Sequence, residues 1–128
     1  AVIDFDLSQN KIFISSAGHP DVVLLSEGKI SKLNVKGKMI GITDDVVYSQ
    51  ISHKIQKNDK ILFYTDGLFE EFNENGDELG ESGLMELIEK SKEKEIGNMC
   101  LELTDALKSW LGEMPVNDDI TLIGIQVK

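Results

Sequence analysis

The chain has 128 residues, of which 41% are hydrophobic, and this suffices for one globular domain with its own core. Its formal charge is −10, from 23 acidic and 13 basic residues, and every basic residue is a lysine. An acidic surface repels phosphate backbones, so the composition disfavours nucleic-acid binding. No apolar run is long enough to span a membrane, and the single cysteine, Cys100, excludes an intrachain disulfide, which favours a cytoplasmic location.

The first part of the chain has the pattern of four short strands. Apolar and polar residues alternate over residues 2–7, which predicts a half-buried strand, and residues 11–15 complete an antiparallel hairpin. Residues 21–26 and 29–33 predict a second hairpin across the two-residue turn Glu27-Gly28. We expect these four strands to form a β-meander.

The middle of the chain predicts a loop and two further strands. Residues 36–43 are too rich in glycine for a regular element and too apolar for a free linker, so we expect an ordered loop. Residues 46–55 return to strand character, with His53 on an apolar face as a packed core or rim residue. Residues 61–64 form an apolar run, which predicts a buried sixth strand that begins at Lys60.

Helical patterns follow this strand. Residues 68–72 predict a short helix. Leu84, Leu87 and Ile88 share one face of a longer helix, for which Ser82 is the expected cap.

The strongest helical pattern covers residues 96–111, where apolar residues repeat at three- and four-residue steps until Gly112. Cys100 lies on its apolar face, so we interpret it as a core thiol. Residues 120–127 then alternate as a last strand. Six strands, two main helices and a final strand predict an α+β domain with helices packed on a mostly antiparallel sheet.

Asp66 is the first candidate for chemistry, because it stands where the strand of residues 60–64 ends, in Thr65-Asp66-Gly67. A carboxylate at a strand end is held by the sheet while its oxygens reach out of the core, as a hard divalent cation requires. The alternative is a simple turn, which is the commoner use of Asp-Gly.

Asp118 and Asp119 form a second acidic feature, directly before the last strand. If this strand and the strand of residues 60–64 are antiparallel neighbours, the carboxylates of Asp66 and Asp118 lie at the same sheet edge and can share a cation. The alternative is again a turn with solvated carboxylates.

Three other chemistries do not match the sequence. An EF-hand loop with Gly76 at its sixth position would place Ser82 where a bidentate glutamate is needed. No Gly-Lys-Ser/Thr phosphate loop occurs. Cys100 has no arginine near it to activate a thiolate, since the chain contains none.

Four sequence blocks in this order resemble the SpoIIE-like branch of the PPM metal-dependent serine/threonine protein phosphatases. The resemblance spans almost the whole chain. The blocks are Ser16-Ala17-Gly18-His19-Pro20, Met39-Ile40-Gly41-Ile42, Phe63-Tyr64-Thr65-Asp66-Gly67-Leu68-Phe69-Glu70 with Asn75-Gly76-Asp77-Glu78-Leu79-Gly80, and Asp118-Asp119-Ile120-Thr121-Leu122.

The resemblance implies an antiparallel β-sandwich with flanking helices and two Mn²⁺ or Mg²⁺ ions at one end. It implies hydrolysis of phosphoserine or phosphothreonine by a metal-activated water, without a covalent intermediate. Asp66 and Asp118 match metal ligands of the family. Asp119, Gly67, His19 and Glu70 match supporting positions rather than catalytic ones.

One block of the family is missing from this sequence. The family carries an earlier Asp-x-x-Gly-His-Gly-like block, whose aspartate bridges both metals. We therefore expect residues 1–128 to be one domain unit, the C-terminal portion of a PPM-type phosphatase domain, incomplete at its N-terminus and inactive alone. An upstream sensor or regulatory domain is expected in the parent chain.

These patterns leave three hypotheses for function. The first is a phosphatase whose substrate, by analogy with the family, is a phosphorylated anti-sigma-factor antagonist or a similar bacterial signalling protein. The second is a non-catalytic phosphatase-like module that binds a partner or dimerises. The third is an acidic structural domain in which the aspartates only form turns.

Overall fold

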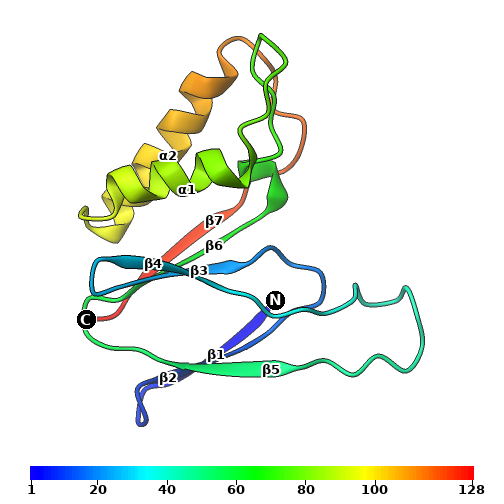
Figure 1. Ribbon diagram of the computed structural model, residues 1–128, viewed down its shortest axis with the longest axis vertical. Helices are drawn as coiled ribbons and strands as arrows, with labels where there is room; N and C mark the ends of the chain where they lie inside the picture. The colour runs from blue at the N-terminus through cyan, green and yellow to red at the C-terminus, as the bar shows by residue number, and fades with distance from the viewer.

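The structure, a computed structural model, describes residues 1–128 and consists of two antiparallel sheets covered on one side by helices (Figure 1). The first sheet has the order β1 (Val2–Asp6), β2 (Lys11–Ser15), β5 (Gln50–Lys54). The second has the order β4 (Lys29–Leu33), β3 (Val22–Ser26), β6 (Lys60–Tyr64), β7 (Leu122–Gln126). The helical elements are the 3₁₀ turn η1 (Asp66–Leu68), α1 (Gly80–Ser91) and α2 (Ile96–Leu111).

Strand β6 lies between two hydrophobic cores, and all five of its residues are buried. Ile61 and Phe63 pack in the core between the two sheets, whereas Leu62 and Tyr64 pack in the core under the helices. Successive side chains of a strand point to opposite faces, so a strand covered on both faces by hydrophobic cores is apolar on both faces. This explains the continuous apolar run of residues 61–64, whereas Lys60, the first residue of β6, lies at the buried end of the strand.

The antiparallel β-sandwich with flanking helices is confirmed, but the expected single β-meander is wrong. The hairpin β1–β2 lies in one sheet, where Ile14 pairs with Ile51 of β5. The hairpin β3–β4 lies in the other sheet, where Val23 pairs with Leu62 of β6. Each hairpin has an apolar face, and stacking the two faces buries both, which one flat meander could not do.

Three local predictions are corrected by the structure. His53 is exposed rather than packed, because β5 is an edge strand and is shorter than the predicted residues 46–55. Ser82 is not a helix cap, because α1 already begins at Gly80. The predicted short helix is the single turn η1, which starts at Asp66 and ends at Leu68.

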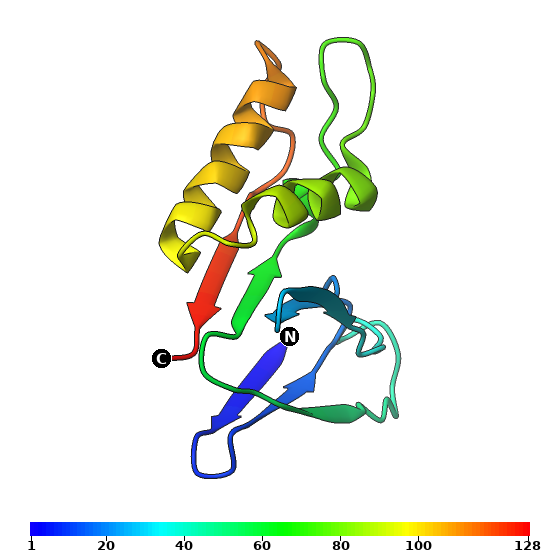
Figure 2. The ribbon, with the colours of Figure 1, turned by 60° about the vertical axis from the view of Figure 1, so that its left-hand side comes forward.

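Helix α2 matches its prediction: it ends at Leu111 and is followed by Gly112, which has a positive φ of 63°. Its buried face, with Met99, Leu103 and Leu107, covers the second sheet, and Figure 2 shows the helix running beside β7. No helix of the chain is both long and apolar enough to cross a membrane.

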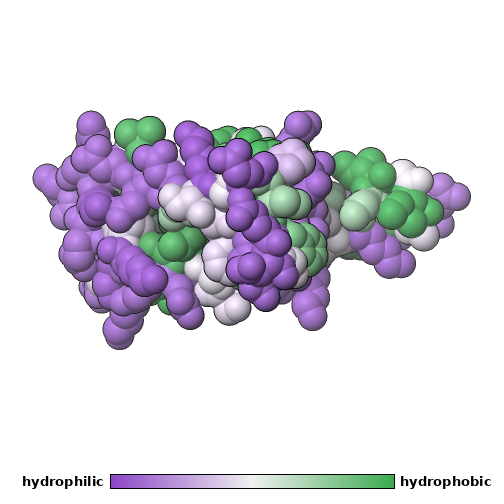
Figure 3. All heavy atoms as spheres, turned by 90° about the horizontal axis from the view of Figure 1, so that it is seen from above, coloured by the Kyte–Doolittle hydropathy of each residue, from purple (hydrophilic) through white to green (hydrophobic).

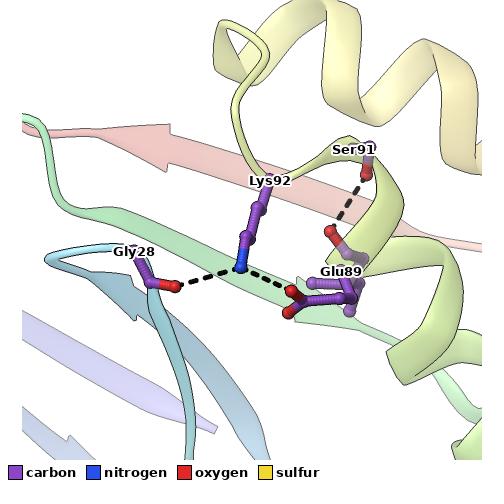
Figure 4. Close-up of polar contacts among 5 residues, drawn as sticks. Gly28, Glu89, Ser91 and Lys92 are labelled. Carbon is purple, nitrogen blue, oxygen red and sulfur yellow. Dashed lines mark hydrogen bonds and ion pairs between the residues drawn. The ribbon is translucent and has the colours of Figure 1, made fainter.

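The corner between α1 and α2 is tied to the second sheet at the end where β6 begins. The ammonium group of Lys92 donates to the carbonyl of Gly28 at 3.2 Å and to the carboxylate of Glu89 (Figure 4). The buried Lys60 in turn donates to the carbonyl of Lys92. The helices are therefore fixed at one end of β6, and the opposite end carries Asp66.

Candidate metal centre

The pairing of β6 with β7 brings the candidate aspartates to one edge of the second sheet. The two strands are antiparallel, and Tyr64, the last residue of β6, lies opposite Leu122, the first of β7. Asp66 follows Tyr64, while Asp118 and Asp119 precede Leu122. The structure thus brings these three residues together at one end of the sandwich, as the strand ends predict.

Thr65 connects the two segments beyond the last strand pair. Its N–H donates to the carbonyl of Thr121 at 3.1 Å. Its hydroxyl donates to the carbonyl of Asp119 at 2.8 Å and accepts the N–H of Thr121 at 2.9 Å. Three hydrogen bonds, one to Asp119 and two to Thr121, therefore fix the segment after Asp118 to the residue next to Asp66.

Gly67 allows the turn η1 to lie directly against the backbone of the Asp118-Asp119 segment. A Cβ atom at this position would lie 2.9 Å from the carbonyl oxygen of Asp119 and 3.2 Å from that of Asp118. Because backbone atoms cannot rotate away, any larger residue would push the two segments apart. Gly67 is needed for this close approach.

Glu71 is a buried carboxylate that orders the residues before Asp119, and sequence reasoning missed it. It is only 1% exposed. Its Oε1 accepts the N–H of Asn117 at 2.9 Å and that of Asp118 at 3.3 Å, and its Oε2 accepts the side-chain amide of Asn117 at 3.0 Å. The sequence predicts a short helix over residues 68–72, and this helix gives no reason to expect a buried Glu71. Residues 69–72 are instead irregular and alternate buried and exposed, and this alternation places Glu71 inside and Glu70 outside.

The carboxylates of Asp66, Asp118 and Asp119 are exposed, and none of them forms an ion pair. Asp118 Oδ1 accepts the N–H of Asp119 at 2.7 Å, which orients its side chain. Hard carboxylate oxygens without a neighbouring lysine suit Mg²⁺ or Mn²⁺. No group of three or more His, Cys, Asp or Glu side chains is arranged to enclose a metal ion. Asp66 and Asp118 would supply only some of the six oxygen ligands that such an ion takes.

His19 and Glu70 lie around this end, and neither side chain forms a hydrogen bond with the aspartates, although the backbone N–H of Glu70 donates to the carbonyl of Asp66 at 2.9 Å. His19 belongs to the loop that enters β3, and β3 is antiparallel to β6, so the loop lies at the same end of the sheet as Asp66. Its Nδ1 donates to the carbonyl of Pro20 at 2.8 Å, which fixes the orientation of the ring. The Glu70 side chain is exposed and makes no hydrogen bond.

Tyr64 closes the core directly beneath this edge. Its ring meets that of Phe69 edge to face, with the ring centroids 6.0 Å apart. Burial, together with the negative charges of Glu81 and Asp21, raises the pKa of Tyr64 to about 12. The phenol therefore stays neutral at physiological pH and serves as packing rather than as an acid or base.

Comparison with known proteins identifies the family. The sequence model of the family "Stage II sporulation protein E (SpoIIE)" matches residues 1–128. The chain belongs to the SpoIIE family. Sequence comparison also finds a curated relative, the phosphoserine phosphatase RsbU of Bacillus subtilis (strain 168), which is 29% identical to this chain over 127 residues. The match covers 98% of this chain and 37% of RsbU.

Solved structures show the same fold as this SpoIIE-family chain. The SiaA-PP2C domain of Pseudomonas aeruginosa matches with a TM-score of 0.84 at 20% identity, over 98% of this chain and 50% of that one. The phosphatase domain of SpoIIE from Bacillus subtilis matches with a TM-score of 0.73 at 14% identity, over 98% and 55%. The chain therefore spans about half the length of these domains, and a smaller share of RsbU.

Proposed function

We propose that residues 1–128 are the C-terminal portion of a PPM-type phosphatase domain, which hydrolyses phosphoserine or phosphothreonine on a signalling protein. The observation that supports this most is the interlocked pair of strand ends at Thr65–Gly67 and Asp118–Asp119, which presents carboxylates without counter-charges in a SpoIIE-family chain. Turns that only reverse the chain would not need Gly67 to fit beneath a neighbouring backbone.

Asp66 and Asp118 are the proposed ligands of Mn²⁺ or Mg²⁺, with two ions in the complete domain. When bound, such ions lower the pKa of the attacking water and neutralise the phosphoryl oxygens. Thr65 and Glu71 hold the two ligand-bearing segments in fixed register. Asp119 and Gly67 support the site, the first by its backbone and the second by the space it leaves.

Direct attack by water also agrees with the nucleophiles that the chain offers. Burial raises the pKa of the Cys100 thiol, so this group stays protonated near neutral pH and cannot readily accept a phosphoryl group. It packs on α2 against Gly124 of β7. No covalent phosphoenzyme is therefore part of the proposal.

The test uses the full-length protein with Mn²⁺ and a phosphoserine peptide. We expect turnover by the wild type and a loss of about a hundredfold or more in Asp66→Asn and in Asp118→Asn, since each removes a ligand charge. Asp105→Asn is the matched control, because Asp105 is exposed on α2 and pairs only with Lys108. Full activity of Asp66→Asn would contradict the metal role.

The alternative is a non-catalytic phosphatase-like module that binds a partner or dimerises. It is favoured if the wild type shows no turnover while binding of its phosphoprotein partner persists. For the active case, we propose a phosphorylated anti-sigma-factor antagonist or a similar bacterial signalling protein as the cytoplasmic substrate. An upstream sensor or regulatory domain in the parent chain is part of this proposal and agrees with the greater length of RsbU.

A further inference from the structure

The connection from α2 to β7 carries Asp118 on an exposed piece of chain. Every residue from 112 to 119 is exposed, and none of them belongs to either hydrophobic core. Figure 3 views the molecule from the end where α2 finishes, and most of the surface over the helices is hydrophilic there. Pro115, in the middle of the connection, has no N–H to donate. Hydrogen bonds from other segments therefore have to hold this connection in place.

The segment between η1 and α1 supplies part of this support. Its outer part, residues 72–78, is a short arm closed by a β-bridge between its first and last residues. Inside the arm, the side chain of Asn73 accepts the N–H groups of Asn75 and Asp77, both at 2.9 Å. In Figures 1 and 2 this arm stands beside the C-terminal end of α2. The 72–78 arm therefore has a shape of its own, and it is built onto the segment that starts at Asp66.

Glu74 joins this arm to the start of the connection. Its Oε1 accepts the N–H of Glu113 at 2.8 Å, and its carboxylate forms no ion pair. The same carboxylate lies against Gly112, where a Cβ atom would come within 2.7 Å of Oε1. Gly112 also has a positive φ of 63°, so glycine is favoured there both by the backbone and by the contact. The carboxylate of Glu74 is thus seated where α2 ends and the connection begins.

Glu71 and Glu74 hold opposite ends of the same connection. Glu71 bonds to its far end, at Asn117 and Asp118, whereas Glu74 bonds to its start. Both carboxylates belong to the segment that directly follows Asp66, so the chain leaving one candidate ligand fixes the chain that leads to the other. A metal ligand has to be held to within about 0.5 Å of its working position. An exposed connection fastened only at Glu71 would be free to turn about that contact and to carry Asp118 with it.

We propose that Glu74 is a positioning residue for the metal site, which acts on Asp118 through the connection and does not touch the metal itself. This rests on the proposed function and its metal ligands. Glu74 lies between residues 63–70 and 75–80, which match the family, so the resemblance assigns it no role. Residues that orient a ligand directly change metal affinity by about 10- to 100-fold, and because Glu74 acts at one further remove, we expect about threefold to tenfold.

The experiment measures two quantities on the full-length protein. Electron paramagnetic resonance of free Mn²⁺ gives the Mn²⁺ affinity, and hydrolysis of a phosphoserine peptide gives the Mn²⁺ concentration for half-maximal rate. For Glu74→Ala we expect the affinity to fall and this concentration to rise, each by about threefold to tenfold, while the rate at saturating Mn²⁺ stays within about twofold of wild type.

Two further variants separate position from charge. Glu74→Gln keeps an oxygen that can accept the N–H of Glu113, so its Mn²⁺ affinity should stay close to that of the wild type. Glu78→Ala is the matched control, because it removes the same charge from the same arm, and the exposed Glu78 side chain forms no hydrogen bond or ion pair. It should bind Mn²⁺ as the wild type does.

Each other outcome has a defined meaning. Unchanged Mn²⁺ affinity in Glu74→Ala would overturn the positioning role, whether or not the thermal midpoint of the variant falls. Equal weakening by Glu74→Gln or by Glu78→Ala would overturn it too, because the affinity would then follow charge rather than position. A wild type that binds Mn²⁺ without hydrolysing the peptide would overturn the proposed function, while the titration still decides the role of Glu74. A wild type that binds no Mn²⁺ would overturn both.

Discussion

The buried carboxylate of Glu71 accepts hydrogen bonds from both the backbone N–H and the side-chain amide of Asn117, at 2.9 and 3.0 Å. A single side chain thus holds the residue before Asp118, and through a longer bond of 3.3 Å the N–H of Asp118 itself. The position of the candidate ligand depends on a carboxylate that does not reach solvent.

Glu71→Ala should therefore destabilise the fold and loosen the candidate site. Three donors lose a charged acceptor, and we expect the free energy of unfolding to fall by about 2–4 kcal/mol. Urea denaturation measures this. Glu70→Ala is the matched control, because the Glu70 side chain is exposed and forms no hydrogen bond, and it should change stability by less than about 0.5 kcal/mol. Equal effects of the two variants would contradict the anchoring role.

Gly67→Ala should separate the two segments of the candidate centre. The added methyl group would lie 2.9 Å from the carbonyl oxygen of Asp119, and we expect a loss of about 1–3 kcal/mol in stability. Gly97→Ala provides the comparison, because nothing lies within 4 Å of a Cβ there and alanine favours the α2 helix. Thermal unfolding of both variants should show opposite signs, and a neutral Gly67→Ala would show that the segments are not in contact.

Mn²⁺ should bind weakly to the 128-residue chain. Two carboxylates leave most of a six-coordinate shell to water, so we expect one low-affinity site that Asp66→Asn weakens by about tenfold. Titration followed by electron paramagnetic resonance of free Mn²⁺ measures the affinity. Tight binding of two ions to these residues alone would contradict this expectation, as would equal binding by Asp66→Asn.

Stability at high pH should depend on Tyr64. Its folded-state pKa is raised to about 12 from an ordinary value of 10.0, chiefly by burial, so the unfolded chain releases this proton first. The contribution is fully present below pH 10 and is lost as the pH rises from 10 to 12. We expect the free energy of unfolding of the wild type to fall more steeply over this interval than that of Tyr64→Phe. Tyr48→Phe, which alters the only other tyrosine, should keep the steep fall.

The arrangement of the candidate site could be predicted from sequence because it follows from strand ends. An apolar run stopping before Asp66 and another starting after Asp119 suffice to place both aspartates at one edge, provided the strands are neighbours. Gly67 could also be identified from sequence as a supporting position, but the structural reason why a glycine is needed there could not. The contact that excludes a side chain comes from the Asp118-Asp119 backbone, which is 51 to 52 positions away in the chain.

Other features needed tertiary information. The patterns of residues 2–15 and 22–33 each predict a hairpin, but only pairing with β5 and β6 assigns the hairpins to different sheets. Glu70 and Glu71 are chemically identical neighbours, and the conformation of the chain alone decides which is buried. His53 faces the apolar side of β5 yet is exposed, because no further strand covers that edge.

The position of β6 in both hydrophobic cores also determines how the molecule opens. Neither the helical layer nor the first sheet can detach without exposing one face of β6. The amide protons of β6 should therefore exchange with solvent only when the whole domain unfolds. Asp66 follows directly on this most protected segment. Local fluctuations that move the outer loops therefore leave the backbone that carries Asp66 almost stationary.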